Sequence, residues 1–326
     1  MSQNISQTAN KPIALVTGAT GFIGKRLCSV LVGGGYRIRI YSNHSYSDFD
    51  SLLVSESNWH QGSLLDKSQL AIACEGVDVV FHLAGGAHSR NIWADQINKD
   101  IIGSQNLYLI SRSAGAKRFV FVSSILASDS APHSYAWGKY SVEQFLISNE
   151  KLDPRTKVIV LRSANVYGPN MKGILPILIK AASRKLLPGL PDLSSKFHMV
   201  SVDDLCRVAL DVSSSPNSVL ASPSVFVVSD GQQYSPNRIE RAVYEGLGQK
   251  PPRFKSTRAL IALAAIFGRI LNYTGIKKNQ FGLHFYHNIV RGRQTSAVSS
   301  IRHYDFSPTH TLESAMPEII ASLKGN

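Results

Sequence analysis

A short apolar run, Ile13 to Thr17, is followed directly by a glycine-rich turn at residues 18–24, and a helical pattern begins at about Phe22. The run has the length and the branched side chains of a strand that is buried on both faces of a parallel sheet. Cys28, Val30, Leu31 and Val32 lie on the helix that follows. A strand that passes through glycines into a helix is the first half of a βαβ unit, and this pattern constrains the fold more than any other feature of the chain.

The glycine turn predicts a binding site for the pyrophosphate of a dinucleotide. Residues without side chains let the backbone approach the phosphates closely, and the first N–H groups of the helix can bind anionic oxygens. Glycine turns also occur in ordinary tight loops, so the interpretation depends on the position of this turn between a buried strand and a helix. The residues expected to contact the pyrophosphate are Gly18, Thr20, Gly21, Phe22, Ile23 and Gly24.

Apolar runs and helical patterns alternate from Ile13 to Val166. This alternation predicts an α/β fold with a doubly wound parallel sheet. The later runs expected to form strands of the same sheet lie at 36–41, 77–83, 117–124, 158–161 and 225–229. The segments expected to form helices lie at 92–113, 135–148 and 171–185. Because the chain is too long for one small domain, we also expect a second, smaller domain.

A second motif lies far downstream. Tyr135 and Lys139 are four residues apart, so they lie on one face of the predicted helix. The strand before that helix ends in Ser123 and Ser124, and open parallel sheets bind their ligands at the carboxyl ends of strands. We therefore expect Ser124 to hold a substrate oxygen near the phenol and the ammonium. The alternative is a solvated helix end with a surface lysine.

These motifs and their order resemble the extended short-chain dehydrogenase/reductases of the NAD-dependent epimerase/dehydratase group. The resemblance covers about residues 12–240, and it is carried by residues 17–24, Phe81-His82-Leu83-Ala84, Asn98, Val122-Ser123-Ser124, Tyr135 to Lys139 and Leu161 to Pro169. It implies a Rossmann domain that binds NAD or NADP and a smaller C-terminal substrate-binding domain. It also implies that Ser124, Tyr135 and Lys139 act together on a hydroxyl or a ketone.

The implied reaction moves a hydride between a secondary alcohol and a nicotinamide ring, and it needs a group that removes and returns the hydroxyl proton. Tyr135 would be that group. A free phenol has a pKa of about 10, so we expect the ammonium of Lys139 and the charge of the nicotinamide to favour the phenolate. Lys139 would also bind the nicotinamide ribose, and Ser124 would donate a hydrogen bond to the carbonyl oxygen.

The rest of the cofactor would contact residues near the ends of several strands. NAD enzymes usually carry an acidic residue after the second strand, where this chain has Ser42-Asn43-His44. The missing carboxylate slightly favours NADP and leaves NAD open, because no arginine occupies the turn, although Arg37 and Arg39 are near. Ser63 stands where relatives commonly have aspartate. The further cofactor contacts that the resemblance implies are Ser42, Asn43, Ser63, Leu64, Leu83, Ala84, Gly85, Asn98 and Val122, together with Tyr135 and Lys139.

The resemblance also implies a class of substrate. Asn165 matches an asparagine that meets the diphosphate of nucleotide-activated sugars in many relatives, and a role in capping the turn at 167–169 is equally open. Ile125 and Leu126 stand where dehydratases of the family carry an acid and a base, which disfavours dehydration. For His198, a structural hydrogen bond is the alternative to a ligand contact. The expected substrate contacts are His88, Ser124, Ile125, Asn165, Leu175, Pro188 and His198.

The favoured hypothesis is an NAD(P)-dependent enzyme that acts on a nucleoside-diphosphate sugar, by epimerisation at C4 or by reduction of a 4-keto sugar, similar to bacterial enzymes of polysaccharide assembly. The alternative is a reductase of a lipophilic ketone or alcohol, such as a sterol or a phenolic, which the apolar segment 259–267 favours and the basic substrate domain opposes. A third hypothesis is a non-catalytic dinucleotide-sensing protein. Such proteins usually lose the tyrosine or the lysine, and both are present here.

The formal net charge of +13 raises the question of a nucleic-acid partner. After residue 250 there are ten Lys and Arg against three Asp and Glu, but they are scattered and form no recognised nucleic-acid motif. We therefore expect an anionic small-molecule substrate, no nucleic acid, and only a weak tendency of residues 258–271 to contact a membrane surface. No run of the sequence approaches the roughly 20 apolar residues of a membrane span.

The cysteines and the ends of the chain complete the expectations. Three widely spaced cysteines indicate a reducing cytoplasm without a disulfide framework, and neither they nor the histidines have the spacing of a zinc site. The resemblance makes a homodimer plausible, through two helices that pack against their mates. The expected organisation is a disordered leader at 1–10, a cofactor-binding domain at 11–170 to which 196–232 return, and a substrate-binding domain at 171–195 and 233–326.

Overall fold

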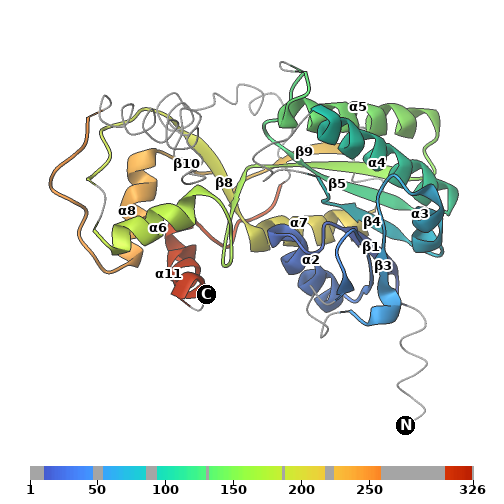
Figure 1. Cartoon of the computed structure of the whole chain (residues 1–326), viewed down its shortest axis with the longest axis horizontal. Helices are drawn as coiled ribbons and strands as arrows, with labels where there is room; N and C mark the ends of the chain where they lie inside the picture. Colours follow the sequence, from blue (N-terminus) through green and yellow to red (C-terminus); the bar gives the residue numbers. More distant parts are fainter. Residues whose placement is uncertain are drawn as a thin grey trace, which may run out of the picture. The chain divides into compact units, whose positions relative to one another are not determined.

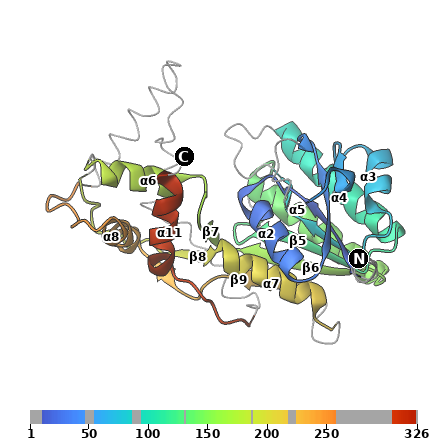
Figure 2. The same cartoon turned by 90° about the horizontal axis from the view of Figure 1, so that it is seen from below.

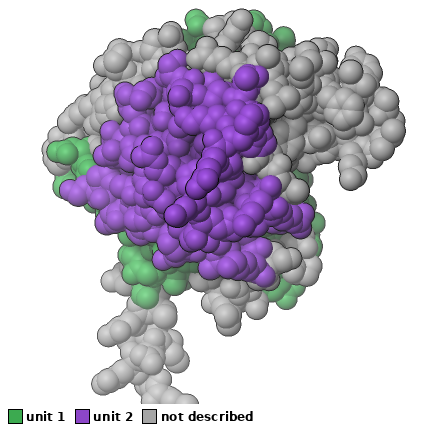
Figure 3. All heavy atoms as spheres, turned by 90° about the vertical axis from the view of Figure 1, so that its left-hand side faces the viewer, with its two compact units in different colours: residues 1–163, 202–228, 297–306 green, residues 164–201, 229–296, 307–326 purple. Residues whose placement is uncertain are grey.

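The structure of the chain is a computed structural model that describes residues 11–46, 54–85, 94–129, 132–185, 188–216, 224–257 and 305–324. The expected leader at 1–10, His88 and the segment 258–271 lie outside these residues. The chain divides into two compact units, which Figure 3 shows in different colours. Unit 1 comprises residues 1–163, 202–228 and 297–306, and unit 2 comprises residues 164–201, 229–296 and 307–326. Residues 164–170, 196–201 and 229–232 therefore belong to unit 2, whereas we expected them in the cofactor-binding domain.

Unit 1 is built on a seven-stranded parallel sheet with the order β3-β2-β1-β4-β5-β6-β9. The strands are β1 (Ile13–Thr17), β2 (Arg37–Ser42), β3 (Trp59–Gln61), β4 (Val79–His82), β5 (Arg118–Ser124), β6 (Lys157–Ser163) and β9 (Ser224–Val228). The strand order reverses between β1 and β4, and open α/β sheets bind ligands in the crevice at such a switch point. The predicted α/β fold with a doubly wound parallel sheet is confirmed.

Helices cover both faces of this sheet, as Figures 1 and 2 show. One face carries α3 (Lys67–Cys74), α4 (Ala94–Ser113) and α5 (Tyr135–Leu152), and the other carries α2 (Phe22–Gly33) and α7 (Val202–Ser214). Side chains just before two of the helices explain where they begin. Asp66 accepts hydrogen bonds from the N–H groups of Ser68 and Gln69, both at 3.1 Å, and Ser134 accepts one from Trp137 at 3.1 Å.

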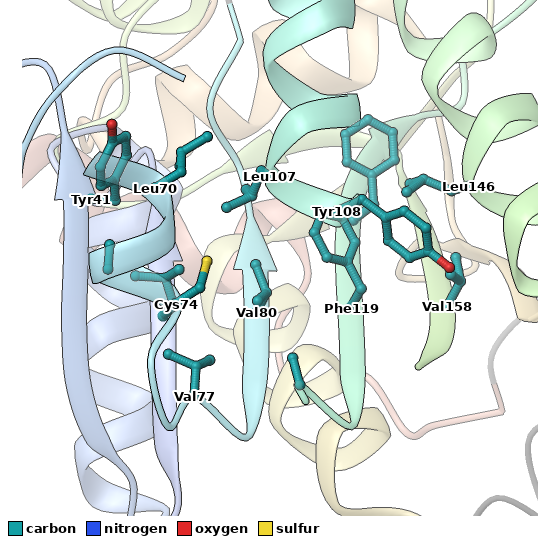
Figure 4. Packing of buried hydrophobic residues seen from close by; sticks show 14 of the residues in the cluster. Tyr41, Leu70, Cys74, Val77, Val80, Leu107, Tyr108, Phe119, Leu146 and Val158 are labelled. Carbon is teal, nitrogen blue, oxygen red and sulfur yellow. The ribbon is translucent and has the colours of Figure 1, made fainter. Parts of the chain in front are cut away.

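A hydrophobic core lies between the sheet and helices α3, α4 and α5 (Figure 4). Leu70 of α3, Val80 of β4 and Leu146 of α5 are all buried in this core. The ring of Tyr108 on α4 meets that of Phe119 on β5 edge to face, with their centroids 5.4 Å apart. Full burial of each large apolar side chain contributes about 1.5–3 kcal/mol to the stability of the fold. This packing fixes β4 and β5, whose carboxyl ends carry the candidate site.

Unit 2 contains a three-stranded sheet with the order β10-β8-β7 and three described helices. The strands are β7 (Asn165–Tyr167), β8 (Phe197–Ser201) and β10 (Gln233–Tyr234), and the helices are α6 (Ile174–Ser183), α8 (Pro236–Gly246) and α11 (Leu312–Lys324). β8 pairs in parallel with β7 and antiparallel with β10. Leu312, Met316 and Ile319 of α11 are buried in the same core as Val243 of α8, so the last described helix completes the core of unit 2.

A buried polar network ties α11 to the sheet of unit 2. The Tyr234 hydroxyl donates to the Asp230 carboxylate at 2.6 Å and accepts a hydrogen bond from the backbone N–H of Leu312 at 3.1 Å. The Tyr167 hydroxyl donates to the backbone oxygen of His310 at 3.1 Å. Burial raises the pKa of Asp230, and the hydrogen bonds that its carboxylate accepts oppose that rise.

Within the ranges that the structure describes, no helix is long and apolar enough to cross a membrane. The same residues contain no group of three His, Cys, Asp or Glu side chains that could hold a metal ion. The three cysteines, Cys28, Cys74 and Cys206, are free and buried.

Candidate active site

The turn between β1 and α2 makes close contacts that only glycine allows. Gly18 has a φ of +75°, and a Cβ at this position would lie 2.8 Å from the backbone nitrogen of Ala84. A Cβ on Gly24 would overlap the carbonyl oxygen of Gly18 and would lie 2.7 Å from the Cα of Ala19. The two glycines therefore let the turn lie against the end of β4 and let α2 pack directly on the turn.

Gly21 faces solvent at the N-terminus of α2, and its geometry suits an anion. The N–H of Gly21 donates to the Gly18 carbonyl at 3.0 Å, and no described side chain caps the helix. The first turn of α2 carries no acidic residue that would repel a phosphate. A Cβ on Gly21 would meet one described atom, the Gly18 oxygen at 3.2 Å, so the space in front of this residue is open. The pyrophosphate of a dinucleotide fits these features.

A buried chain of neutral hydrogen bonds lies behind the turn. The Thr17 hydroxyl is 2.7 Å from Nδ1 of His82, and Nε2 of His82 is 2.8 Å from the Ser104 hydroxyl. Burial and then the charge of Lys139 lower the pKa of His82 to about 3, so the imidazole is neutral.

Of the predicted cofactor contacts after β4, Leu83 and Ala84 are half-buried, and Gly85 is exposed.

The carboxyl end of β2 carries no acidic or basic residue. Ser42 is buried, and its hydroxyl accepts a hydrogen bond from the N–H of His44 at 3.1 Å, whereas Asn43 is exposed. Arg37 begins the strand, roughly 16 Å from Ser42 at the usual rise per residue. Arg39 donates to the carbonyl oxygens of Ala73 at 2.9 Å and Glu75 at 2.6 Å. Arg39 therefore binds the end of α3, and Arg37 lies at the opposite end of β2 from Ser42.

Ser63 and Leu64, two further predicted cofactor contacts, follow β3. Ser63 is exposed, and its hydroxyl accepts a hydrogen bond from the N–H of Leu65 at 3.2 Å. The Tyr41 hydroxyl donates to the carbonyl of Ser63 at 2.8 Å. Leu64 packs close to Gly103 of α4, where a Cβ would lie 2.6 Å from that of Leu64. These contacts hold the loop after β3 against α4.

Ser124, Tyr135 and Lys139 come together at the carboxyl end of β5. The Ser124 hydroxyl is near enough to the Tyr135 phenol to lower its pKa as a hydrogen-bond partner. Nζ of Lys139 donates to the carbonyl of Val122 at 3.0 Å, and it lies 4.6 Å from the ring centroid of Phe121 and 6.0 Å from that of Tyr135. Lys139 is therefore not a solvated surface lysine, because its ammonium faces the sheet.

Burial dominates the acid–base properties of this group. It raises the pKa of Tyr135 to about 12, and the hydrogen bond with Ser124 only partly opposes that rise. Burial also lowers the pKa of Lys139 to about 8, against the opposing charges of Asp100 and Glu143. The expected acidification of Tyr135 by Lys139 is not found, because burial raises the pKa of the phenol and Ser124, rather than Lys139, is the neighbour that lowers it.

Two buried ion pairs fix α5 against β6. Glu143 is fully buried, and both of its carboxylate oxygens lie 3.0 Å from Nε of Arg162, while the Ser123 hydroxyl donates to the same carboxylate. Glu150 and Lys157 form the second pair, at 2.9 Å. Removing one partner of such a buried pair typically costs about 3–5 kcal/mol. The pairs therefore hold α5 in the rotation that directs Tyr135 and Lys139 toward the end of β5.

A pocket lies between α4, α5 and the ends of β4 and β5, and sequence reasoning missed one of its polar residues. Asp100 lines it together with Tyr135 and Lys139, whereas the predicted Asn98 does not. The other lining residues are Ala84, Gly85, Ile97, Ile101, Ser104, Phe121, Gly138 and Val142. Positions 97, 100, 101 and 104 share one face of a helix, so the helical period of α4 could have identified Asp100.

The residues expected to contact substrate are divided between the units. In unit 1, Ile125 is buried, and its N–H donates to the carbonyl of Ser163 at 3.0 Å. In unit 2, the exposed Asn165 uses its side-chain amide to donate to the carbonyl of His198 at 3.1 Å, and no bond to the turn at 167–169 is found among the described residues. Leu175 is buried in the core of unit 2, and Pro188 is exposed.

His198 is the candidate substrate residue with an unused polar atom. The residue is half-buried on β8, and its Nδ1 is buried with no hydrogen-bond partner among the residues that the structure describes. Its carbonyl accepts the hydrogen bond from Asn165. The side chain of His198 therefore does not make the structural hydrogen bond that was the alternative to a ligand contact, as far as the described residues show.

Comparisons with known proteins identify the family of this chain. The sequence profile of the NAD dependent epimerase/dehydratase family matches residues 14–228. The chain is 26% identical over 243 residues to a UDP-glucose 4-epimerase of Vibrio cholerae, covering 68% of this chain and 71% of that protein. It is 28% identical over 250 residues to a ceramide reductase of Caulobacter vibrioides, covering 75% and 73%.

The fold is also similar to the crystal structure of the Thermotoga maritima UDP-glucose 4-epimerase with UDP-glucose, with a TM-score of 0.66, 22% identity, and coverage of 96% of this chain and 99% of that one. The region that the family profile matches runs from β1 to β9 and includes the glycine turn, Ser124, Tyr135 and Lys139. The chain therefore belongs to the NAD-dependent epimerase/dehydratase family and is an NAD(P)-dependent enzyme of its oxidoreductase and epimerase class.

Proposed function

We propose that this enzyme transfers a hydride to or from a sugar carbon of a nucleoside-diphosphate sugar, with Ser124, Tyr135 and Lys139 as its catalytic residues. The observation that carries the proposal is that Tyr135 and Lys139 line the same pocket, with the ammonium of Lys139 held on the Val122 carbonyl of β5. This group lies at the carboxyl end of β5, on the edge of the sheet where the glycine turn after β1 also lies. Ligands of open α/β sheets bind at that edge.

Each residue of the group has a role in the proposed reaction. NAD or NADP, with its pyrophosphate on the turn from Gly18 to Gly24, would supply or accept the hydride at the substrate carbon. The Ser124 hydroxyl would hold the substrate oxygen. The pKa of Tyr135 is raised to about 12, so the phenol carries its proton at neutral pH and would donate it to the oxygen of a ketone during reduction. Lys139 would then stabilise the phenolate that remains.

The proposed sugar substrate has two supports. The chain is similar to two UDP-glucose 4-epimerases, one of which was solved with UDP-glucose. Its net charge of +13 also suits an anionic ligand. The second candidate is a reductase of a lipophilic ketone or alcohol, which the similarity to a ceramide reductase favours. The apolar helix α6 in unit 2, with Ile174 exposed, supports this second candidate.

We propose NADP as the slightly favoured cofactor, because no carboxylate of β2 or of the residues just after it would repel a 2′-phosphate. Arg37 lies at the start of β2 and Arg39 is bound to a carbonyl of α3, so neither arginine supports binding of a 2′-phosphate. The preference for NADP depends only on the absence of an acidic residue at the end of β2. Calorimetric titration of the purified protein with NADP⁺ and NAD⁺ tests it. Tighter binding of NAD⁺ would contradict the preference.

The catalytic assignment is tested with Tyr135→Phe. We expect this variant to lose turnover while the dissociation constant of the cofactor stays within a few-fold, because the phenol is needed for proton transfer. Tyr140→Phe, which also removes a phenol from α5, is the matched control and should keep full activity. Full activity of Tyr135→Phe would refute the assignment, and a dinucleotide-sensing protein would then be the better description.

The substrate class is tested on the wild-type protein in the same assays. UDP-sugars and long-chain keto lipids are offered with NADPH or NADH, and oxidation of the cofactor is followed by absorbance. Epimerisation of UDP-sugars is followed by chromatography of the products. Turnover with the lipids alone would replace the sugar proposal by the second candidate. Cofactor that remains bound through purification would favour epimerisation, because an epimerase retains its NAD and a reductase must exchange NADPH.

We also propose a homodimer through α4. Ile102 is 49% exposed and Leu109 is 36% exposed, and seven-residue spacing places them on one face of that helix. Ile102→Glu should shift the molar mass from light scattering toward that of a monomer, and an unchanged mass would count against this surface. The three buried free thiols support our proposal that the protein resides in the cytoplasm.

A further inference from the structure

Lys139 is surrounded by few charges that could keep its ammonium protonated. On β5 it contacts the Val122 carbonyl and the Phe121 ring, neither of which carries a charge, and on β4 it is close to His82, which is neutral. Its own helix, α5, contributes the phenol of Tyr135 and the carboxylate of Glu143. The charge of Glu143 is largely offset, because that carboxylate is bound to the guanidinium of Arg162.

Among the residues that the structure describes, the other charged group that acts on Lys139 is Asp100, on α4. Both side chains line the same pocket, and both lie beside Gly85. A Cβ on Gly85 would lie 3.6 Å from Nζ of Lys139 and 4.0 Å from Oδ2 of Asp100, so the two groups border the same small space. The other carboxylate oxygen, Oδ1, accepts a hydrogen bond from the side-chain amide of Gln96 at 2.8 Å.

The backbone around Asp100 is fixed by the buried network described above. The Ser104 hydroxyl donates to the carbonyl of Asp100 at 2.6 Å and is also bonded to His82. The carboxylate of Asp100 therefore extends from a part of α4 whose backbone is held by buried hydrogen bonds. The negative charge of Asp100 raises the pKa of Lys139 more than the charge of Glu143 does.

From this geometry we propose that Asp100 is the counter-ion of Lys139 in the pocket and a positioning residue for the reaction, an inference that rests on the function proposed above. Lys139 needs its proton, and with it a positive charge, to stabilise a phenolate at Tyr135. Burial disfavours that proton, and Asp100 compensates across the space beside Gly85. The enzyme therefore depends on a side chain of α4 to keep a side chain of α5 charged.

The test compares the titration of Lys139 in three variants of the full chain. Asp100→Asn keeps the size of the side chain and an oxygen that can accept from Gln96, but it removes the charge. Asp100→Glu keeps the charge. Asp95→Asn is the matched control, because Asp95 is an exposed acid in the first turn of the same helix. Asp100→Ser replaces Asp100→Asn if that variant does not fold.

The readout is the NMR signal of lysine labelled with ¹³C at Cε, with the signal of Lys139 assigned by its loss in Lys139→Met. In Asp100→Asn we expect the titration midpoint of Lys139 to move to lower pH than in the wild type. In Asp100→Glu and Asp95→Asn, the titration midpoint of Lys139 should equal that of the wild type. A wild-type midpoint in folded Asp100→Asn, or an equal shift in Asp95→Asn, would overturn the inference.

Turnover provides a second measurement that separates the two proposals. If both hold, the alkaline limb of kcat/KM moves to lower pH in Asp100→Asn, together with the NMR midpoint. A shifted midpoint without turnover on any substrate class would support the counter-ion and overturn the proposed function. Turnover with an unshifted midpoint would overturn the counter-ion and leave the proposed function in place.

Discussion

Replacing Gly24 by alanine tests whether the close approach of α2 to the glycine turn shapes the cofactor site. The added Cβ would overlap the Gly18 oxygen and would lie 2.8 Å from the carbonyl carbon of Gly18 and 2.7 Å from the Cα of Ala19. All three are backbone atoms, which cannot rotate away as a flexible side chain can. The helix must therefore move outward from the turn. Gly33→Ala is the matched control, because no described atom lies within 4 Å of a Cβ at that position of the same helix.

The two substitutions should change stability in opposite directions. Overpacking costs about 1–3 kcal/mol, and the gain from alanine over glycine within a helix is at most about 1 kcal/mol. Because the neighbours of Gly24 are rigid, we expect Gly24→Ala to lose about 2 kcal/mol and Gly33→Ala to gain up to about 1 kcal/mol. In a domain of 150–250 residues, each kcal/mol changes Tm by about 2–4 °C, so Tm should fall by roughly 4–8 °C and rise by up to about 4 °C, respectively.

Outward movement of α2 would also displace the N–H groups that we propose to bind the cofactor phosphates. We expect a loss of binding energy of about 1.4 kcal/mol or more in Gly24→Ala, which is a tenfold rise in Kd. Thermal unfolding followed by circular dichroism measures the change in Tm. Isothermal titration with NAD⁺ and NADP⁺ measures the change in Kd. If Gly24→Ala melted at the wild-type temperature and kept the wild-type Kd, the close-packing argument would be refuted.

Three further predictions concern charged side chains of unit 1. Lys139→Ala should weaken cofactor binding and turnover together, and an effect on Tm alone would indicate a purely structural lysine. Burial lowers the pKa of Lys139 to about 8, so its ammonium is present below that pH. We therefore expect kcat/KM for reduction to fall as the pH rises through about 8. A profile that stays flat to alkaline pH would contradict this role. Arg39→Gln should lower Tm without changing the ratio of the NAD⁺ and NADP⁺ dissociation constants, because the guanidinium binds the end of α3, and a changed ratio would place Arg39 at the cofactor.

Elements with a strong local pattern could be predicted from the sequence. The bounds of β1 agree with the predicted run at 13–17, and α5 begins at Tyr135 as expected. Both have a clear signal, an unbroken apolar run in one case and helical spacing in the other. The helix continues to Leu152 because its far end is held by the pair of Glu150 with Lys157, which depends on tertiary packing and is not visible in local propensity.

Short elements carried no usable pattern. We did not predict the three-residue β3, the two-residue β10 or α3, a helix of eight residues. A strand of two or three residues shows no periodicity, and it forms only because a neighbouring strand supplies the hydrogen-bond partners. β10 illustrates this, because Gln233 and Tyr234 are strand residues only through their pairing with His198 and Phe197.

Sequence motifs identified the chemical groups of the site better than their surroundings. The spacing of Tyr135 and Lys139 placed both on one helical face, but it carried no information on how strongly burial would raise the pKa of the phenol. Desolvation depends on everything packed around a group, and most of that is distant in sequence. Asp100 was missed for a related reason, since the motif that includes Asn98 does not define which side of the helix lines the pocket.

The dependence of unit 2 on α11 has a consequence for synthesis of the chain. The core around Tyr167, Tyr234 and Val243 is complete only when Leu312, Met316 and Ile319 have joined it. Until the ribosome has translated residues 305–324, unit 2 cannot bury its apolar surface. Every strand of the seven-stranded sheet in unit 1 has been synthesised before that point. The nascent protein would therefore mature in two stages, and chaperones would have their greatest opportunity to bind it between them.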